Sequence, residues 1–493
     1  MSDYRFFSIL LLSLLGSPLT AAEHFILAAG GSTPQSSQVS IEKNVVWIDA
    51  LMRQRSFDSH QLLFTSGNSF SEDIVQYAPM NPDVQKWLPL SRLYGQQDQG
   101  LSIFRHNQVP DVMGAATAGN LSNKLQQSIA TLTAGDDLFF VYNGHGGWES
   151  SDTSENTLRL WDHSQLNVRQ FANIMQSKPA GANVRYVFPQ CYAGGFSRSL
   201  ANDVIYPVAE DIQPGQCGFF AVPDTAKAEG CTRGVDVGDY RDYSTFFFAA
   251  LTGRTRQGDP LQPRPARHGK PVSLAEAHAW AYTYGVSTDI PFSTSEYFLE
   301  LWQPWYSRWQ SAVDPGADNP YFKIAQHLAE ATGIEATDLV PMARTVLLRR
   351  GKYEQMIRDM DGDIEQIRQR EAVVRRQILA RFQQQWPAAE QPYSAAYMIL
   401  MTEKSGVVLE WILQQPDYKT LENLQLTIER MGLDRLGLSR QAARYTRLHR
   451  MLKLAAIFES FKRFASDEAQ ATYQSLLSCE SWVLPSQVAT NHE

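Results

Sequence analysis

Two short apolar segments of the chain each end in a residue that can take part in acyl chemistry. Residues 138–144 lead into His145, and residues 184–190 lead into Cys191. An apolar run of this length that ends beside glycines is typical of a buried strand in a parallel sheet. Open α/β sheets bind ligands at the carboxyl ends of their strands, so we expect His145 and Cys191 to face one crevice. A cysteine beside a histidine that can take up its proton is the minimal equipment for catalysis by a thiolate nucleophile.

Glycines adjoin both residues, which allows tight turns and close approach of a substrate. Gly146 follows His145 directly, and the glycines at 194–195 lie just after Cys191. We expect a helix at about 196–201, whose N-terminal amides would favour the thiolate form of the cysteine. The backbone amides of Gly146 and Cys191 are the candidate oxyanion hole for a tetrahedral intermediate.

The two motifs resemble those of a known group of enzymes. Asn143-Gly144-His145-Gly146-Gly147 and Gln190-Cys191-Tyr192-Ala193-Gly194-Gly195 are similar to the active-site motifs of the caspase-like cysteine peptidases, which include caspases, metacaspases, legumains, clostripains and gingipains. His145 and Cys191 are 46 positions apart, close to the spacing of about 50 known for caspases.

The resemblance covers roughly residues 24–294 and implies a fold and a mechanism. The implied fold is the caspase/haemoglobinase-like α/β/α sandwich with a mostly parallel sheet. In the implied mechanism Cys191 attacks a peptide carbonyl and His145 protonates the leaving amine. Pro189 stands where many relatives carry Asp, Glu or Gln, so the family's specificity cannot be transferred to this chain.

The resemblance also implies where a substrate side chain would bind. In the family, the strand after the nucleophile and its following loop line the specificity pocket, and here that loop contains two carboxylates, Asp224 and Glu229. A carboxylate in a partly dehydrated pocket favours a cation, so we expect Arg or Lys before the cleaved bond. Gln190 is a third candidate substrate-binding residue. The alternative is that both acids point into solvent, with Lys227 as their partner.

Length and composition indicate two domains and exclude one class of protein. The chain has 493 residues, 43% hydrophobic content and a net charge of -8. Strands alternate with helices over residues 23–300, which predicts an α/β domain. Residues 301–493 carry only helical patterns, including a coiled-coil-like seam from Tyr353 to Ile378, and predict an all-α domain with a long helical hairpin. The acidic balance argues against binding of nucleic acid.

The N-terminus has the layout of a secretory signal peptide over residues 1–22. An apolar run of ten residues, 6–15, follows Arg5, and small residues precede the expected cleavage site. The run is shorter than the roughly 20 residues of a membrane-spanning helix. We therefore expect an exported protein, periplasmic or secreted, that touches a membrane only if the signal segment stays uncleaved.

The number of cysteines limits the disulfides that the chain can form. There are four: Cys191, Cys217, Cys231 and Cys479. With Cys191 at the reaction centre, we expect at most a disulfide between Cys217 and Cys231, with Cys479 free. No histidine pairs with a cysteine at zinc-ligand spacing, so neither a metal nor another cofactor is expected.

The sequence therefore predicts a cysteine endopeptidase whose partner is a peptide or protein substrate. Two other functions remain open. One is an inactive caspase-like module that binds a protein partner through its helical domain. The other is a transpeptidase that uses the same Cys-His dyad to pass its acyl group to an amine instead of water.

Overall fold

The structure is a computed structural model. It describes residues 21–78, 81–96, 101–230, 240–265, 270–303, 315–316, 318–335 and 338–487.

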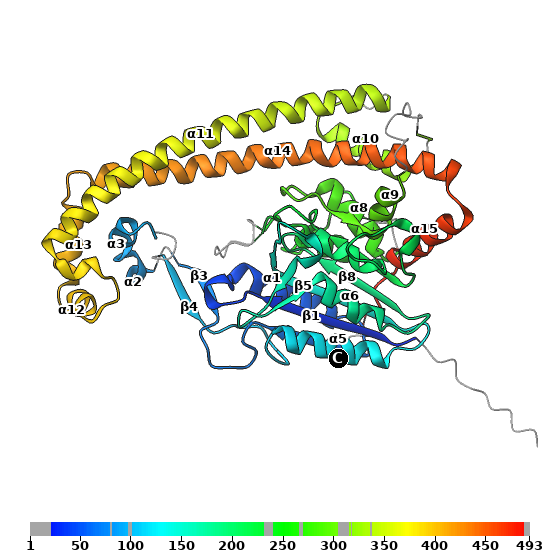
Figure 1. The fold of residues 1–493 in the computed structure, drawn as a ribbon, viewed down its shortest axis with the longest axis horizontal. Coiled ribbons are helices and arrows are strands. Elements are labelled where there is room, and N and C mark those ends of the chain that lie inside the picture. Colours follow the sequence, from blue (N-terminus) through cyan, green and yellow to red (C-terminus); the bar gives the residue numbers. More distant parts are fainter. Residues whose placement is uncertain are drawn as a thin grey trace, which may run out of the picture.

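A mostly parallel sheet forms the centre of the first part of the chain (Figure 1). The strand order is β10-β9-β8-β5-β1-β2. Only β10 on this path is antiparallel to its neighbour. Beside the path, β6 pairs antiparallel with the end of β5, and β7 pairs antiparallel with β6. The strands are β1 (Glu23–Gly30), β2 (Ser59–Phe64), β5 (Asp137–Gly147), β6 (Thr157–Arg159), β7 (Gln165–Asn167), β8 (Asn183–Phe188), β9 (Gln216–Phe220) and β10 (Phe292–Ser293).

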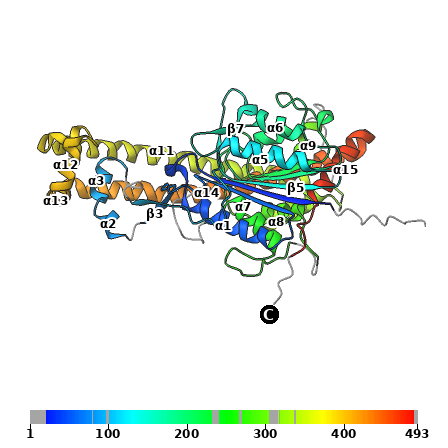
Figure 2. The same cartoon turned by 90° about the horizontal axis from the view of Figure 1, so that it is seen from below.

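Helices cover both faces of this sheet, which gives three layers. Figure 2 shows α5 (Ala118–Thr131) and α6 (Val168–Gln176) on one face, with α1 (Val39–Arg53), α7 (Tyr243–Thr252) and α8 (Leu274–Tyr284) on the other. The central strands are apolar at nearly every position because both of their faces are buried; residues 138–142 of β5 are each 0% exposed. The predicted α/β class with a mostly parallel sheet is confirmed.

An insertion between β2 and α5 was not predicted. It consists of the antiparallel strands β3 (Ile74–Tyr77) and β4 (Ser102–Arg105), with the short helices α2 (Pro82–Gln85) and α3 (Leu88–Leu93) at its far end. Leu90 and Leu93 of α3 share an apolar cluster with Phe382, Val408 and Leu421 of the helical region. The insertion therefore reaches the distal end of that region (Figure 1).

The second part of the chain is helical, as expected. Two helices of 47 residues, α11 and α14, run side by side as a long antiparallel hairpin (Figure 1). Ile364 and Ile378 of the predicted seam are buried, so the periodic pattern does mark the contact face. The helices are α9 (Thr294–Trp302), α10 (Pro320–Ala331), α11 (Leu339–Gln385), α12 (Ala395–Glu403), α13 (Ser405–Leu413), α14 (Tyr418–Phe464) and α15 (Asp467–Glu480); short 3₁₀ helices are η1 (Pro34–Ser36), η2 (Thr153–Glu155), η3 (Ala193–Leu200), η4 (Ala209–Asp211) and η7 (Pro387–Glu390).

A disulfide joins the end of the helical region to the sheet. Cys217 of β9 is bonded to Cys479 of α15, with an S–S distance of 2.03 Å. The expected Cys217–Cys231 pair is therefore wrong, and so is the expectation that Cys479 is free; Cys231 lies outside the described residues. The prediction chose the cysteine nearest in sequence. The fold instead packs α15 against β8 and β9, where the Cys479 carbonyl accepts a 2.9 Å hydrogen bond from Nε of Arg185.

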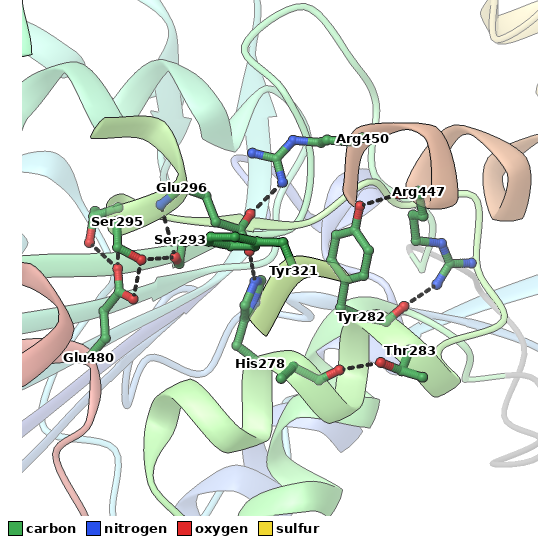
Figure 3. A network of polar contacts seen from close by, with 12 residues as sticks. His278, Tyr282, Thr283, Ser293, Ser295, Glu296, Tyr321, Arg447, Arg450 and Glu480 are labelled. Carbon is green, nitrogen blue, oxygen red and sulfur yellow. Dashed lines mark hydrogen bonds and ion pairs between the residues drawn. The ribbon is translucent and has the colours of Figure 1, made fainter. Parts of the chain in front are cut away.

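Buried charges connect α14 and α15 to the α/β layers (Figure 3). Glu296 pairs with Arg450 of α14 and lies 3.3 Å from Nε2 of His278. Burial opposes ionisation of Glu296, but Arg450 and His278 hold its pKa at about 2. Glu480 accepts hydrogen bonds from the Ser295 amide and the Thr294 hydroxyl at 2.6 and 2.7 Å. The chain beyond residue 301 is thus attached to the α/β layers at both α14 and α15.

Candidate active site

The register between β5 and β8, continued past its last pair, brings His145 level with Cys191. Val141 is paired with Val187, a separation of 46 positions (187 − 141), and His145 and Cys191 have the same separation (191 − 145). The backbones meet just beyond the paired residues, since a Cβ at Gly146 would lie 1.8 Å from the Cys191 carbonyl oxygen. Position 146 must therefore be glycine, and the two strand ends bring His145 and Cys191 to one edge of the sheet.

This edge is also the point where the direction of strand addition reverses. The chain passes from β1 to β2 on one side, and from β5 to β8 and β9 on the other. Ligands of open α/β sheets bind at the carboxyl ends of the strands at such a point.

His145 is fixed by two acceptors from the segment that follows β1. Its Nε2 lies 2.8 Å from the carbonyl oxygen of Ser36 and 2.8 Å from Oε1 of Gln38. A carbonyl oxygen only accepts, so Nε2 carries a proton, and Nδ1 is the ring atom left to accept or deliver one. Burial lowers the pKa of His145, an effect that the Ser36 carbonyl opposes and Arg159 reinforces. A neutral imidazole is therefore the resting form.

Cys191 is the free cysteine of the described residues, and its thiol is covered by a backbone segment. The amide nitrogen of Ala228 lies 3.3 Å from Sγ, and Sγ lies 3.7 Å from the Ala228 carbonyl oxygen. Burial raises the pKa of the Cys191 thiol and Asp289 adds to the rise, while the Ala228 backbone and Lys227 oppose it. The resting thiol is thus protonated.

The turn after Cys191 differs from the expected helix. Tyr192 has a left-handed backbone with φ 60°, and the 3₁₀ helix η3 starts at Ala193, two residues beyond the nucleophile. The backbone amide that lies against Sγ of Cys191 is that of Ala228, which precedes neither η3 nor its first turn. The candidate oxyanion-hole amides belong to Gly146 and Cys191, whose backbones are in direct contact.

Asp224 lies close to this turn and is partly open to solvent. A Cβ at Gly194 would lie 2.6 Å from the Asp224 amide nitrogen, so the turn packs against this residue. Oδ2 of Asp224 accepts a 2.9 Å hydrogen bond from the Thr153 hydroxyl and lies 3.7 Å from Nη2 of Arg198. With 33% of its side chain exposed, Asp224 is available to a ligand.

Glu229 is paired with a cation more closely than Asp224 is. Its carboxylate pairs with the guanidinium of Arg440 from α14 and accepts a 2.9 Å hydrogen bond from the Thr288 amide. The alternative expectation was that Lys227 is the partner of Asp224 and Glu229. Lys227 is instead exposed, and the partner of Glu229 is Arg440 of the helical region. Glu229 lies 13% exposed and is not a free site for a substrate cation.

Gln190, the third candidate substrate-binding residue, is 3% exposed. Within the described part of the chain, neither atom of its side-chain amide has a hydrogen-bond partner. Its Cγ would lie 3.2 Å from a Cβ at Gly146, so it packs beneath the strand ends rather than facing solvent.

Three residues that hold parts of the site in place were not predicted, because no motif in the sequence marks them. Gln38 holds His145, as described above. The buried Asn156 donates to the Asp224 carbonyl at 2.7 Å and accepts from the Glu149 amide at 3.0 Å, which links two loops. The buried carboxylate of Asp289 accepts from the Glu229 amide at 2.8 Å and the Tyr243 amide at 2.9 Å.

Comparisons with known proteins give no family for this chain. No family model and no curated protein matches it. Among solved structures, a crystal structure of a Geobacter sulfurreducens protein, determined as a structural-genomics target, is matched at 12% identity with a TM-score of 0.28. The match covers 49% of this chain and 92% of that chain. A similarity of this size carries no argument about function.

Two kinds of site are absent from the described residues. None of their helices combines the length and apolarity needed to cross a lipid bilayer. Within the same ranges, no group of three or more His, Cys, Asp or Glu side chains is placed to hold a metal ion.

Proposed function

We propose that the protein is a cysteine endopeptidase of the caspase-like type, with Cys191 as nucleophile and His145 as general acid and base. The observation that supports this proposal is the placement of a free thiol and of an imidazole with a defined tautomer at neighbouring strand ends. Nε2 of His145 is committed to Ser36 and Gln38, which leaves Nδ1 for proton transfer at the strand end shared with Cys191.

The proposed reaction proceeds through a thioester. Sγ of Cys191 attacks the peptide carbonyl carbon, and the thiol proton passes to Nδ1 of His145 as the S–C bond forms. The amides of Gly146 and Cys191 stabilise the oxyanion. Nδ1 then gives its proton to the leaving amine as the C–N bond breaks. Water attacks the thioester, and its proton restores the thiol as the acid is released.

We further propose that the enzyme prefers Arg or Lys before the cleaved bond, and that Asp224 supplies the recognising charge. Asp224 is partly exposed and packs against the turn that carries the nucleophile. We do not assign substrate recognition to Glu229, because its charge is already neutralised by Arg440. Arg198 lies 3.7 Å from Asp224 and will compete with the substrate cation, so we expect only a moderate preference.

A peptide library tests both parts of the proposal. Purified protein is incubated with a mixed library, and the cut ends are identified by mass spectrometry. We expect cleavage after Arg or Lys, none with Cys191→Ala, and a weaker basic preference with Asp224→Asn. Cuts concentrated after Asn or Asp would reject the assignment of Asp224. If no peptide is cut under any condition, the inactive binding module becomes the better description.

Export from the cytoplasm is part of the same proposal. Residues 1–20 of the expected signal peptide, 1–22, lie outside the described residues, but the Cys217–Cys479 disulfide gives independent support. Structural disulfides form mainly in oxidising compartments such as the periplasm and the extracellular space.

A further inference from the structure

A short segment of the chain occupies the space directly over the candidate nucleophile. The Ala226 carbonyl accepts a 2.8 Å hydrogen bond from the Tyr192 amide, next to Cys191. Two residues later, both the amide and the carbonyl of Ala228 contact Sγ of Cys191. Residues 226–229, called here the covering segment, thus make backbone contacts where a bound peptide would approach the thiol.

The covering segment is held in place by the helical hairpin. Its last residue, Glu229, pairs with Arg440 near the middle of α14; the Nε atom of Arg440 lies 3.0 and 3.3 Å from the two carboxylate oxygens. Only 13% of the Glu229 side chain and 23% of the Arg440 side chain are exposed. An ion pair this shielded from water is held more firmly than a surface pair.

A second arginine on the same face of α14 holds the neighbouring loop. Arg447 follows Arg440 by seven residues, about two helical turns, and is 1% exposed. It donates to the carbonyl oxygens of Gly285 and Ser287 at 2.7 and 3.1 Å. That loop continues to Asp289, which accepts from the Glu229 amide. The hairpin therefore fixes the covering segment both directly and through the loop beside it.

We propose that the covering segment is an autoinhibitory latch and that the Arg440–Glu229 pair keeps it closed. The proposal rests on the proposed function in taking Cys191 as the nucleophile. In the closed state the thiol contacts Ala228, so a substrate carbonyl reaches Sγ only after the covering segment moves. The folded protein described here is accordingly the latent form.

The same contacts have a competing interpretation with the opposite consequence. If Arg440 instead holds the segment in its substrate-binding position, loss of the ion pair would lower the rate of peptide cleavage and leave access to the thiol unchanged. The two interpretations therefore differ in the sign of a measurable effect.

The test is the rate at which iodoacetamide alkylates Cys191 in the full-length protein, followed by mass spectrometry of the Cys191 peptide. For Arg440→Gln we expect an increase of about tenfold or more, together with faster peptide cleavage. The matched control is Arg435→Gln, since Arg435 lies on the same helix but pairs with Asp361 within the hairpin. The control should alkylate at the wild-type rate, and melting curves of both variants establish that they are folded.

A charge exchange guards against indirect effects of the single substitution. Glu229→Arg combined with Arg440→Glu should restore slow alkylation, because the pair is re-formed with reversed charges. Alkylation of Arg440→Gln at the wild-type rate overturns the latch, whatever the cleavage result. Faster alkylation without cleavage of any peptide supports the latch and counts against the peptidase, so the two proposals fail separately.

Discussion

Gln38 and His145 meet although 107 positions separate them in the chain: Oε1 of the amide lies 2.8 Å from Nε2 of the imidazole. Gln38 directly precedes α1, and His145 lies near the end of β5. The contact exists because β1 and β5 are parallel neighbours, so the segment leaving β1 passes the end of β5. It makes Gln38 a positioning residue, which acts on the reaction through the orientation and tautomer of His145.

Replacement of Gln38 should change the pH dependence of the reaction. In Gln38→Glu the new carboxylate favours the imidazolium form and raises the pKa of His145. The acidic limb of the pH–rate profile should therefore move to higher pH than in the wild type. Gln38→Ala removes an acceptor without adding charge and should mainly lower kcat. Superimposable profiles for wild type and Gln38→Glu would show that the amide does not act on His145.

Cys191→Ala should abolish peptide cleavage and leave the melting temperature nearly unchanged. The substitution removes one sulfur atom from a half-buried residue, together with its contacts to the amide and the carbonyl of Ala228. Turnover by the purified variant that is comparable to the wild type would remove the nucleophile assignment.

His145→Ala should lower the cleavage rate by about 10²- to 10⁴-fold, the range typical for loss of a general acid or base. His163→Asn is the matched control. His163 is exposed and has φ 55°, a left-handed conformation that asparagine tolerates. The control should retain wild-type kcat. A larger loss in the control than in His145→Ala would move the general base to His163.

Cys479→Ser should destabilise the protein by roughly 2–5 kcal/mol, the range seen when native disulfides are removed. The cross-link joins positions 262 residues apart, so it constrains the unfolded chain strongly. Chemical denaturation measures the effect, with Cys191→Ser as the control that leaves the cross-link intact. Mass mapping without reduction should yield one linked peptide pair, containing Cys217 and Cys479. A pair containing Cys191 would contradict the structure.

Asp289 should make the protein less stable as the pH rises from about 4 to about 7. Burial, reinforced by Asp242, raises its pKa from 3.8 to about 7. The folded state therefore binds this proton more tightly than the unfolded state, and stability falls between about pH 4 and pH 7, by at most about 1.4 kcal/mol per pH unit. Asp289→Asn should flatten this dependence. Parallel stability–pH curves for the two proteins would exclude Asp289 as its source.

The pattern of apolar residues along the chain predicted the α/β architecture, because apolar residues follow one another in buried parallel strands and recur every three or four positions in amphipathic helices. The pattern also identified the helical hairpin and placed His145 and Cys191 at strand ends. Contacts between residues far apart in the chain could not be predicted in this way. The sequence around Cys479 does not indicate that it contacts β9, and the sequence around Arg440 does not indicate that it contacts Glu229. The insertion was missed because its helices have only four and six residues, too short for a periodic signal.

The bond between Cys217 and Cys479 has a consequence for proteolysis. A single cut anywhere between these positions, including one in the loop around Glu229 or in the α11–α14 hairpin, would leave two fragments that remain covalently joined. Such a nicked protein would migrate as one species on a non-reducing gel and as two after reduction. Processing within this region would change the chain's connectivity without releasing a piece, so the α15 segment would stay attached to β9 after any such cut.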